Sequence, residues 1–495
     1  MERREPDDSY RHVLKYTGIF GGVQGLKIFV ALVRNKLTAR LLGDAGMGLN
    51  ARFMKIAEIL NACTNFGISF YAVRKISELY EEGTDDDMRR FVAIIRTWSV
   101  WSALLGGLIC FFFASQLNDY YFPEGGHHRM EIMLLSLYVA SMPVEAVECA
   151  MLKGLRRLRT VAIIEVLAAL STFLFTIPFY YFWGMRGVAL SLVMCGWSVA
   201  FVHLYFSLRI YPYRVHLFSP TVIREGWPLI RIGMPYVLAG VAGAVAGGEV
   251  LKFLGDNHVV GQYNVGYVLV VTYGGLIFQA VEADFFPRLS SVNHDKVRLN
   301  HTINQQIDVC VLLMSPILIT FVLFMPWIIQ LLYDSRFLPA VGMSVCAVFY
   351  MFFKAVTTPI AYTSLAKGDS WMYLIMECIY DVVFVLLIRL GYSYMGLTGA
   401  GVALSVAALF DMLMIGLVYG WYYQFRLRLR SVWLILPQGL LLAIGVAAVL
   451  WMDAFYKYGV ASAALLASVL FSLRVFSQNF HELPAWEKLK RKFGF

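Results

Sequence analysis

Hydrophobic segments of about 20 residues recur along the whole chain, separated by short polar stretches. A helix needs about 20 apolar residues to cross the hydrocarbon core of a bilayer, so this pattern predicts an all-α polytopic membrane protein with about fourteen transmembrane helices. Their expected ranges are 15–38, 47–73, 91–115, 131–152, 160–183, 185–209, 228–249, 260–284, 304–329, 341–364, 371–391, 396–420, 431–452 and 455–476.

The composition agrees with this pattern. The chain has 495 residues, of which 59% are apolar and only 15% are charged, and its mean hydropathy is +0.64. A soluble domain has about 25% charged residues. Tyr and Trp gather at segment ends such as 178–184 and 419–425, which is typical of an interfacial aromatic belt. The alternative, that these rings stack on sugars, is less favoured.

Lys and Arg are concentrated on one side of the predicted membrane topology. By the positive-inside rule, that side and both termini are cytoplasmic. The cationic clusters on this side lie near 3–15, 74–96, 153–159, 209–231, 288–298, 367, 426–430 and 474–492. This asymmetry accounts for the net charge of +9, so we expect no nucleic-acid partner.

Short motifs recur at a nearly constant offset and indicate an internal repeat. "LGD" occurs at 42–44 and 254–256, and "GVALS" occurs at 187–191 and 401–405. The repeat predicts two six-helix lobes related by a pseudo-two-fold axis along the membrane normal. The expected parts are an N-lobe (1–210), a cytoplasmic linker (211–227), a C-lobe (228–421), an additional C-terminal helix pair (431–476) and a cytoplasmic basic tail (477–495).

One face of the first predicted helix is polar and cationic. It carries Gln24, Lys27, Ala31, Arg34 and Thr38 at helical spacing. Two cations near a helix centre cost roughly 5 to 7 kcal/mol to place in lipid. Inserting the five apolar residues of the opposite face into the bilayer is favourable by only roughly 2 kcal/mol in total. This face is therefore expected to line other helices or a wet cavity, and a cationic cavity indicates an anionic substrate such as a diphosphate.

The second predicted helix continues this pattern with Arg52, Lys55 and Glu58 spaced by three residues. The alternative for these residues is snorkelling from a helix end, together with a structural pair between Lys55 and Glu58. The candidate diphosphate-binding residues are Arg34, Lys27, Lys55 and Arg52.

Buried charge in the predicted C-lobe is mostly acidic, with Lys354 as the exception. Carboxylates inside a membrane often mark proton or sodium pathways, and a structural salt bridge to Lys354 is an equally good interpretation. The candidate residues for ion coupling or gating are Glu58, Asp308, Lys354, Glu377 and Asp381. The expected coupling ion is H⁺ or Na⁺.

Motifs for other chemistries are not found in the sequence. There is no GxxxxGK[ST] phosphate loop, no HExxH and no Cys/His cluster with metal-ligand spacing. The longest predicted extracytoplasmic loop, 116–130, is short for a catalytic domain. We therefore expect no enzyme, no cofactor and no metal site, which disfavours an oligosaccharide polymerase or ligase.

The segment "FGGVQGLKIFVALVRNKLTARLLGDAGMGLN" (20–50) resembles the start of bacterial O-antigen and capsular polysaccharide flippases. "FFPRLS" (285–290) and the two "GVALS" segments are similar to the same group. This group belongs to the multidrug/oligosaccharidyl-lipid/polysaccharide (MOP) exporter superfamily. The resemblance covers residues 10 to about 425, and the cationic first-helix position of the family falls on Arg34.

The resemblance implies a flippase that moves an undecaprenyl-diphosphate-linked oligosaccharide across the bacterial inner membrane by alternating access. It also implies membrane lipids and other polysaccharide-assembly proteins as partners. The additional helix pair resembles lipid II flippases, which keeps lipid II as an alternative substrate. In that group an acidic residue follows the first-helix arginine, whereas this chain has Asn35. A multidrug or cation antiporter of the same superfamily is the second alternative, and the cationic N-lobe disfavours it.

Overall fold

The computed structural model describes residues 6–123 and 125–479, and these residues form helices and connecting turns without any strand. The helices are α1 (Pro6–Thr64), α2 (Ile68–Glu82), α3 (Asp85–Phe112), α4 (Ala114–Tyr121), α5 (Arg129–Gly154), α6 (Leu158–Trp183), η1 (Gly184–Arg186), α7 (Gly187–Leu208), α8 (Pro220–Leu254), α9 (Asn257–Tyr267), η2 (Val268–Thr272), α10 (Tyr273–Ser291), α11 (Lys296–Leu332), η3 (Ser335–Phe337), α12 (Ala340–Ala366), α13 (Ser370–Tyr422), α14 (Leu429–Trp451) and α15 (Ala454–Asn479). The predicted all-α polytopic fold is confirmed.

Nine helical stretches within the described residues are long and apolar enough to cross a membrane. Two of them, Arg159–Leu208 and Ser370–Tyr422, each contain two predicted spans. The predicted spans 15–38, 47–73 and 260–284 fall instead on α1–α2 and on α9–α10.

The predicted helix over 47–73 is broken in the structure, where α1 ends at Thr64 and α2 begins at Ile68. Phe66 and Gly67 adopt left-handed φ angles of 53° and 66°. The Asn65 side chain accepts a hydrogen bond from the Gly67 amide at 2.8 Å. This local turn competes with the helical hydrogen bonds, and it is stabilised by a polar side chain that hydropathy does not detect.

Left-handed glycines end several helices, and they recur along the chain. Gly43 interrupts α1 at φ 70°, and Gly255 follows α8 at φ 73°. Gly184 follows α6 at φ 54°, and Gly396 interrupts α13 at φ 57°. Glycine reaches this region without the steric cost that a Cβ would add. Each pair has the same separation along the chain, which supports the internal repeat, whereas the lobe boundaries drawn from it stay a prediction.

Contacts divide the chain into two compact units. The first consists of residues 1–262 and 331–336, and the second consists of residues 263–330 and 337–495. By these contacts α8 groups with the first unit, although the repeat places its hydrophobic span at the start of the predicted C-lobe. Most of the predicted basic tail lies at residues 480–495, outside the described residues.

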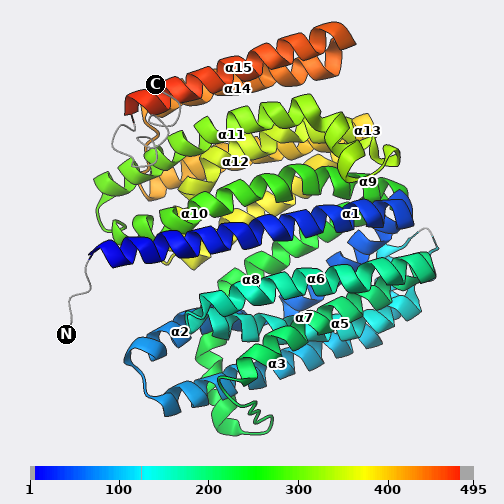
Figure 1. Cartoon of the computed structure of the whole chain (residues 1–495), viewed down its shortest axis with the longest axis vertical. Helices are drawn as coiled ribbons and strands as arrows, with labels where there is room; N and C mark the ends of the chain where they lie inside the picture. The colour runs from blue at the N-terminus through cyan, green and yellow to red at the C-terminus, as the bar shows by residue number, and fades with distance from the viewer. Residues whose placement is uncertain (1–5, 124, 480–495) are drawn as a thin grey trace. The chain divides into compact units, whose positions relative to one another are not determined.

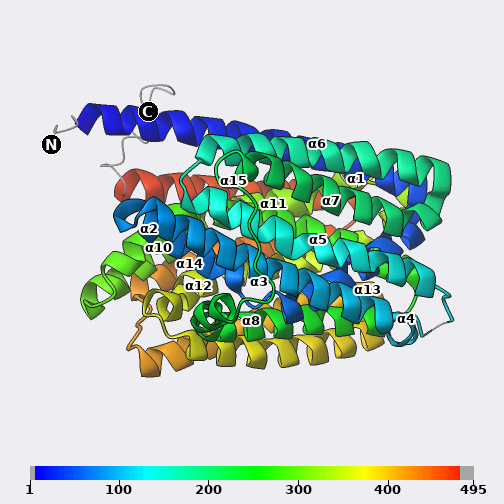
Figure 2. The ribbon, with the colours of Figure 1, turned by 90° about the horizontal axis from the view of Figure 1, so that it is seen from below.

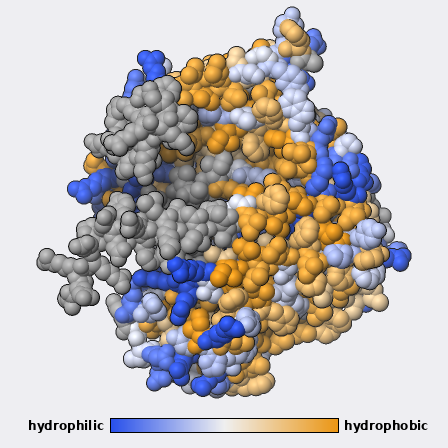
Figure 3. All heavy atoms as spheres, viewed as in Figure 1, coloured by the Kyte–Doolittle hydropathy of each residue, from blue (hydrophilic) through white to orange (hydrophobic). Residues whose placement is uncertain are grey.

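Within the first unit, α6, α7, α5 and α3 pack side by side in that order, as Figure 2 shows. α1 runs beside α6 and also contacts α5, α3 and α8 (Figure 1). Over the helices of this unit, hydrophobic residues cover much of the face seen in Figure 3, and hydrophilic residues gather near the helix ends. This arrangement places the cationic face of α1 against other helices.

Within the second unit, α12 packs against α13, and α14 pairs with α15 (Figure 1). A buried polar contact fastens this C-terminal helix pair. The Gln438 amide donates to Ser472 Oγ at 2.8 Å, and the Ser468 hydroxyl donates to Gln438 Oε1 at 2.6 Å. Ser472 in turn donates to the Leu312 carbonyl of α11 at 2.8 Å. Interhelical hydrogen bonds of this kind average about 0.6 kcal/mol each in a membrane.

Candidate functional site: cationic residues of the first helix

The cationic face of α1 is partly covered, and two residues on its apolar side are exposed. Phe29 and Leu26 on the apolar side are 63% and 42% exposed. Lys27, Ala31 and Arg34 are half-buried. The side chain of Gln24, which the sequence placed on the same face, lies outside the described residues. As the insertion cost predicted, Lys27 and Arg34 point toward neighbouring helices of the first unit.

Lys27 forms an ion pair with Glu165 of α6. The side chains of the two residues are 34% and 31% exposed, so the pair is neither buried nor fully solvated. Glu165 was not among the predicted site residues, and the structure identifies it as the carboxylate that meets Lys27.

Arg34 lies near α5, α6 and α7. Its guanidinium is within electrostatic range of Tyr138, Tyr180 and Cys195, and Nη2 lies 3.5 Å from Asn35 Oδ1. In the part of the chain that the structure describes, no carboxylate forms an ion pair with Arg34. A half-buried guanidinium with phenol neighbours is a good receptor for a phosphate, because it offers several donors in a fixed plane.

Lys55 and Glu58 form an ion pair of 2.6 Å within α1. The Lys55 ammonium also lies against the backbone of α8, since a Cβ on Gly247 would come 3.1 Å from Lys55 Nζ. Glu58 is 54% exposed. The structural pair between Lys55 and Glu58, which was the alternative to ligand binding by Lys55, is therefore formed. The Lys55 side chain is still partly exposed.

Arg52 makes a different set of contacts. It is 3% exposed, donates to the Gly255 carbonyl beyond α8, and stacks over the Phe122 ring at 5.1 Å from its centroid. Arg52 also helps lower the pKa of His128, although burial of the imidazole is the larger cause. These contacts fasten α1 to the end of α8 and to the loop before α5. Arg52 therefore has a structural role and is not one of the residues that we propose to bind the diphosphate.

In the second unit, Lys354 of α12 lies among the predicted carboxylates. Its Nζ is 2.7 Å from Asp411 Oδ2 of α13 and 4.5 Å from the centroid of the Tyr380 ring. Glu377 and Asp381 lie within electrostatic range of the same ammonium. Asp381 is 7% exposed, and its Oδ2 is buried without a hydrogen-bond partner among the described residues.

The structure does not bring Asp308 into this cluster. Asp308 of α11 lies instead within range of Ser431, Arg428 and Arg430 at the start of α14. Asp411, which was not among the candidate residues for ion coupling, is the residue that pairs with Lys354. Within residues 6–123 and 125–479, no three His, Cys, Asp or Glu side chains gather closely enough to hold a metal ion.

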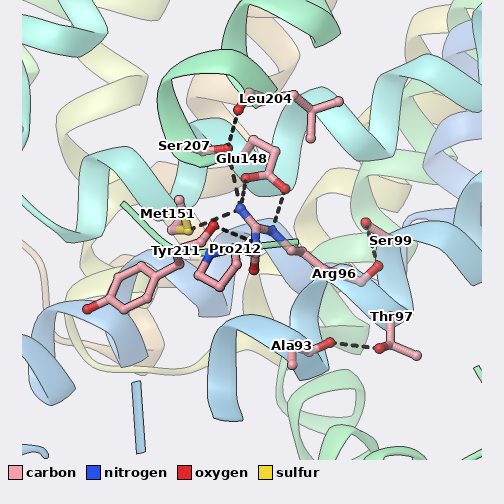
Figure 4. A network of polar contacts seen from close by, with 10 residues as sticks. All are labelled: Ala93, Arg96, Thr97, Ser99, Glu148, Met151, Leu204, Ser207, Tyr211 and Pro212. Atoms are coloured by element: carbon pink, nitrogen blue, oxygen red, sulfur yellow. Dashed lines mark hydrogen bonds and ion pairs between the residues drawn. The ribbon is translucent and has the colours of Figure 1, made fainter. Parts of the chain in front are cut away.

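A buried arginine network lies in the first unit, as Figure 4 shows. Arg96 of α3 and Glu148 of α5 form a bidentate pair with distances of 2.7 and 2.8 Å, and their side chains are 1% and 2% exposed. Arg96 Nη1 donates to the Pro212 carbonyl at 2.9 Å and to the Tyr211 carbonyl at 3.2 Å, and Nη2 donates to Ser207 Oγ at 3.3 Å. The network fixes the segment after α7 to α3 and α5.

A second polar cluster lies near the break in α1. Asp44 Oδ1 is 2.8 Å from His258 Nδ1, and Asp44 Oδ2 accepts from Gln262 at 3.3 Å. Arg336 donates to the Ala39 carbonyl at 3.1 Å and to Asp334 at 3.0 Å. The Arg336 guanidinium, with help from Ser335, lowers the pKa of Asp334 to about 2. Asp334 therefore stays ionised at neutral pH, and its contact with Arg336 is lost only as the pH falls toward that value.

A family model described as polysaccharide biosynthesis protein matches residues 37–342, which is more than half of the chain. The chain belongs to this family. The resemblance to polysaccharide flippases of the MOP superfamily, drawn from residues 20–50 and the shorter motifs, is confirmed at the level of family and fold. No curated protein matches the sequence.

Solved structures similar to this family member share its fold at low identity. The lipid II flippase MurJ, in an inward closed conformation, is 12% identical, covers 93% of this chain and 99% of its own, and has a TM-score of 0.72. An inward-facing multidrug resistance MATE family transporter of the MOP superfamily is 14% identical, with coverages of 80% and 96% and a TM-score of 0.59. A MOP superfamily transporter from Pyrococcus furiosus, described by a reverse polarity of its binding pocket, is 15% identical, with coverages of 81% and 93% and a TM-score of 0.53.

Two charged residues of this polysaccharide biosynthesis family member form a pair that the sequence did not reveal. Arg96 lies in the predicted cytoplasmic cluster 74–96, and Glu148 lies in the predicted span 131–152. Both are buried and paired. The signal in the sequence was weak, because Arg96 directly follows five apolar residues (91–95), and an arginine in this position also suits the end of a transmembrane helix.

Proposed function

We propose that this chain is a flippase for an undecaprenyl-diphosphate-linked oligosaccharide, such as an O-antigen or capsular repeat unit. The observation that carries the proposal is the cationic face of α1 in a member of the polysaccharide biosynthesis family. Lys27 and Arg34 are half-exposed on that face, and Lys55 lies further along the same helix. Arg34 is the principal diphosphate ligand, Lys27 and Lys55 add positive charge, and the sugar follows the lipid diphosphate across the membrane.

The reaction is transport by alternating access and makes or breaks no covalent bond. A guanidinium binds a phosphate through two parallel hydrogen bonds, which holds the headgroup without a metal ion. The diphosphate is expensive to place in hydrocarbon, and the cations of α1 replace part of its hydration.

A translocation assay with the Arg34→Ala variant tests the proposal. Removing a charge-assisted contact is expected to lower the transport rate roughly tenfold to hundredfold. The measurement is translocation of a labelled lipid-linked oligosaccharide in cells or vesicles, normalised to the amount of protein in the membrane. Arg40→Ala is the matched control, because Arg40 is exposed on the same helix and its side chain is outside the cationic face. Wild-type rates in a well-expressed Arg34→Ala protein would refute the assigned role.

A second candidate substrate is lipid II. Its support is the fold shared with the lipid II flippase MurJ over 93% of this chain. Asn35 stands where the sequence comparison with that group leads one to expect an acidic residue, which favours the oligosaccharide substrate. Competition between unlabelled lipid II and a labelled lipid-linked oligosaccharide in the same assay shows which of these two candidate substrates the protein prefers.

We further propose that Lys354, Asp411, Glu377 and Asp381 couple transport to an ion. The support is the carboxylate cluster around one ammonium, with an unpartnered buried oxygen on Asp381. A gradient of H⁺ or Na⁺ would change the charge of this cluster. Imposing each gradient separately on vesicles identifies the ion, and equal transport rates with neither gradient would exclude the proposed coupling.

The chain is proposed to lie in the bacterial inner membrane with both termini in the cytoplasm. The support is the distribution of Lys and Arg among the loops, together with the membrane-spanning helices. Membrane lipids and other polysaccharide-assembly proteins are its proposed partners.

A further inference from the structure

Two of the ion pairs that join helices of the first unit differ in burial. The pair between Arg96 and Glu148 is bidentate, with side chains that are 1% and 2% exposed. The pair between Lys27 and Glu165 has side chains that are 34% and 31% exposed. A buried pair is costly to separate, whereas a partly exposed pair separates at little cost because water or another ion replaces the partner. The Lys27 pair is therefore exchangeable.

We infer that Glu165 is an internal competitor of the substrate: its carboxylate occupies Lys27 until a diphosphate displaces it. This inference rests on the proposed function, because it concerns the same site. The carboxylate and the phosphate compete for one ammonium, so ligand binding exchanges one ion pair for another. No covalent step is involved.

The charge of the ligand makes this competition selective. Lys27 and Arg34 are seven residues apart, which is about 10.5 Å along a helix axis. Arg34 has no carboxylate in an ion pair within the described residues, so a single phosphate can bind there without displacing anything. Occupying Lys27 as well requires a ligand with a second phosphoryl group and enough charge to replace Glu165. The competitor thus favours diphosphate lipids over the monophosphate lipids that form the surrounding bilayer.

The surroundings of Glu165 provide a matched control. Glu145 of α5 and His203 of α7 lie within electrostatic range of Glu165. Glu145 is a half-buried carboxylate in the same region, but the ion pair formed by Lys27 is with Glu165. The Glu145→Gln substitution removes a neighbouring carboxyl group without freeing Lys27.

The experiment measures lipid binding to the purified full-length protein in detergent, by native mass spectrometry or by titration. The probes are undecaprenyl diphosphate and phosphatidylglycerol, which carries one phosphate. Glu165→Gln is expected to bind both undecaprenyl diphosphate and phosphatidylglycerol more tightly, by roughly twofold to fivefold, because an exposed ion pair of this size no longer competes. Glu145→Gln is expected to match wild type for both lipids.

The variants also distinguish a failure of the competitor role of Glu165 from a failure of the proposed function. If Arg34→Ala weakens diphosphate binding while Glu165→Gln binds both lipids like wild type, the competitor role is wrong and the proposed function stands. If neither wild type nor Glu165→Gln binds undecaprenyl diphosphate, the proposed function fails and the competitor role fails with it. Should Glu165→Gln be unstable in a thermal unfolding control, Glu165→Asp keeps the charge with a shorter reach and is expected to show a smaller gain in the same direction.

Discussion

At the scale of single residues, two arginines of the first unit have different roles, and their surroundings explain the difference. Arg34 is half-buried, and its Nη2 lies 3.5 Å from Asn35 Oδ1. Arg96 is fully buried, and Glu148 and the carbonyls of Tyr211 and Pro212 satisfy its donors (Figure 4). A charge in low dielectric must be compensated, so Arg96 is committed to structure, whereas Arg34 remains available to a ligand.

Removing the partner of Arg96 is predicted to destabilise the protein. Glu148→Leu leaves a buried guanidinium without its counter-charge, at an expected cost of about 3 to 5 kcal/mol. The measurement is the apparent melting temperature in detergent, with the amount of folded protein recovered. The double variant Arg96→Met with Glu148→Leu is expected to recover most of the loss, because it removes both charges.

The exposed pair between Arg90 and Glu225 provides the control for this prediction. Its side chains are 66% and 36% exposed. Glu225→Leu is therefore expected to change the stability by less than about 1 kcal/mol. Equal losses for Glu148→Leu and Glu225→Leu would contradict the role assigned to burial.

At the scale of secondary-structure elements, the break in α1 allows a close approach to α9. Gly43 takes a φ of 70°, which ends the first half of α1, and Gly48 in the second half meets Gly261 of α9. A Cβ on Gly48 would come 1.9 Å from the Asn257 carbonyl oxygen, and one on Gly261 would come 2.0 Å from the Asp44 carbonyl oxygen. Small residues permit such backbone contacts between membrane helices.

Alanine at Gly48 or Gly261 is predicted to separate these helices and to lower stability, even though alanine favours a helix over glycine by about 1 kcal/mol. The reason is the clash with a backbone oxygen, which no side-chain rotation relieves. Thermal unfolding of each variant in detergent is the measurement. Gly240→Ala in α8 is the control, since a Cβ there meets nothing within 4 Å, and it is expected to leave the melting temperature equal or higher. A melting temperature for Gly48→Ala that matches Gly240→Ala would show that the contact is not formed.

At the scale of the whole molecule, the charge distribution predicts which loops face the cytoplasm. The segment between α7 and α8 belongs to the cationic side, and the break in α13 near Gly396 belongs to the other side. Phe218 in the first segment is 89% exposed, and Tyr394 near the break is 85% exposed. Equal exposure makes these two positions a matched pair for labelling.

In a cysteine-free background, a membrane-impermeant maleimide is predicted to label Tyr394→Cys in intact spheroplasts. Phe218→Cys is predicted to react only after the membrane is permeabilised. The measurement is the labelled fraction of each protein before and after permeabilisation. Labelling in the reverse order would invert the proposed orientation and would place both termini outside the cytoplasm.

Several features of the candidate site follow from sequence alone. The spacing of Lys27 and Arg34 placed both on one face of a helix, and the cost of charge in lipid predicted that this face is covered. The structure places them there, half-buried. The pairing of Lys55 with Glu58 was also foreseeable, because residues three apart on a helix are neighbours. These inferences needed only local geometry.

The sequence by itself determined the all-α polytopic fold, because the length and hydrophobicity of a segment are local properties. Its motifs indicated the family. It could not show that Lys27 meets Glu165 in α6, or that Arg96 meets Glu148 in α5, since each contact joins helices that are distant in the chain. It also could not distinguish the half-buried Arg34 from the fully buried Arg96. Tertiary packing decided these points, because the neighbours of a charge determine its solvation and therefore its role.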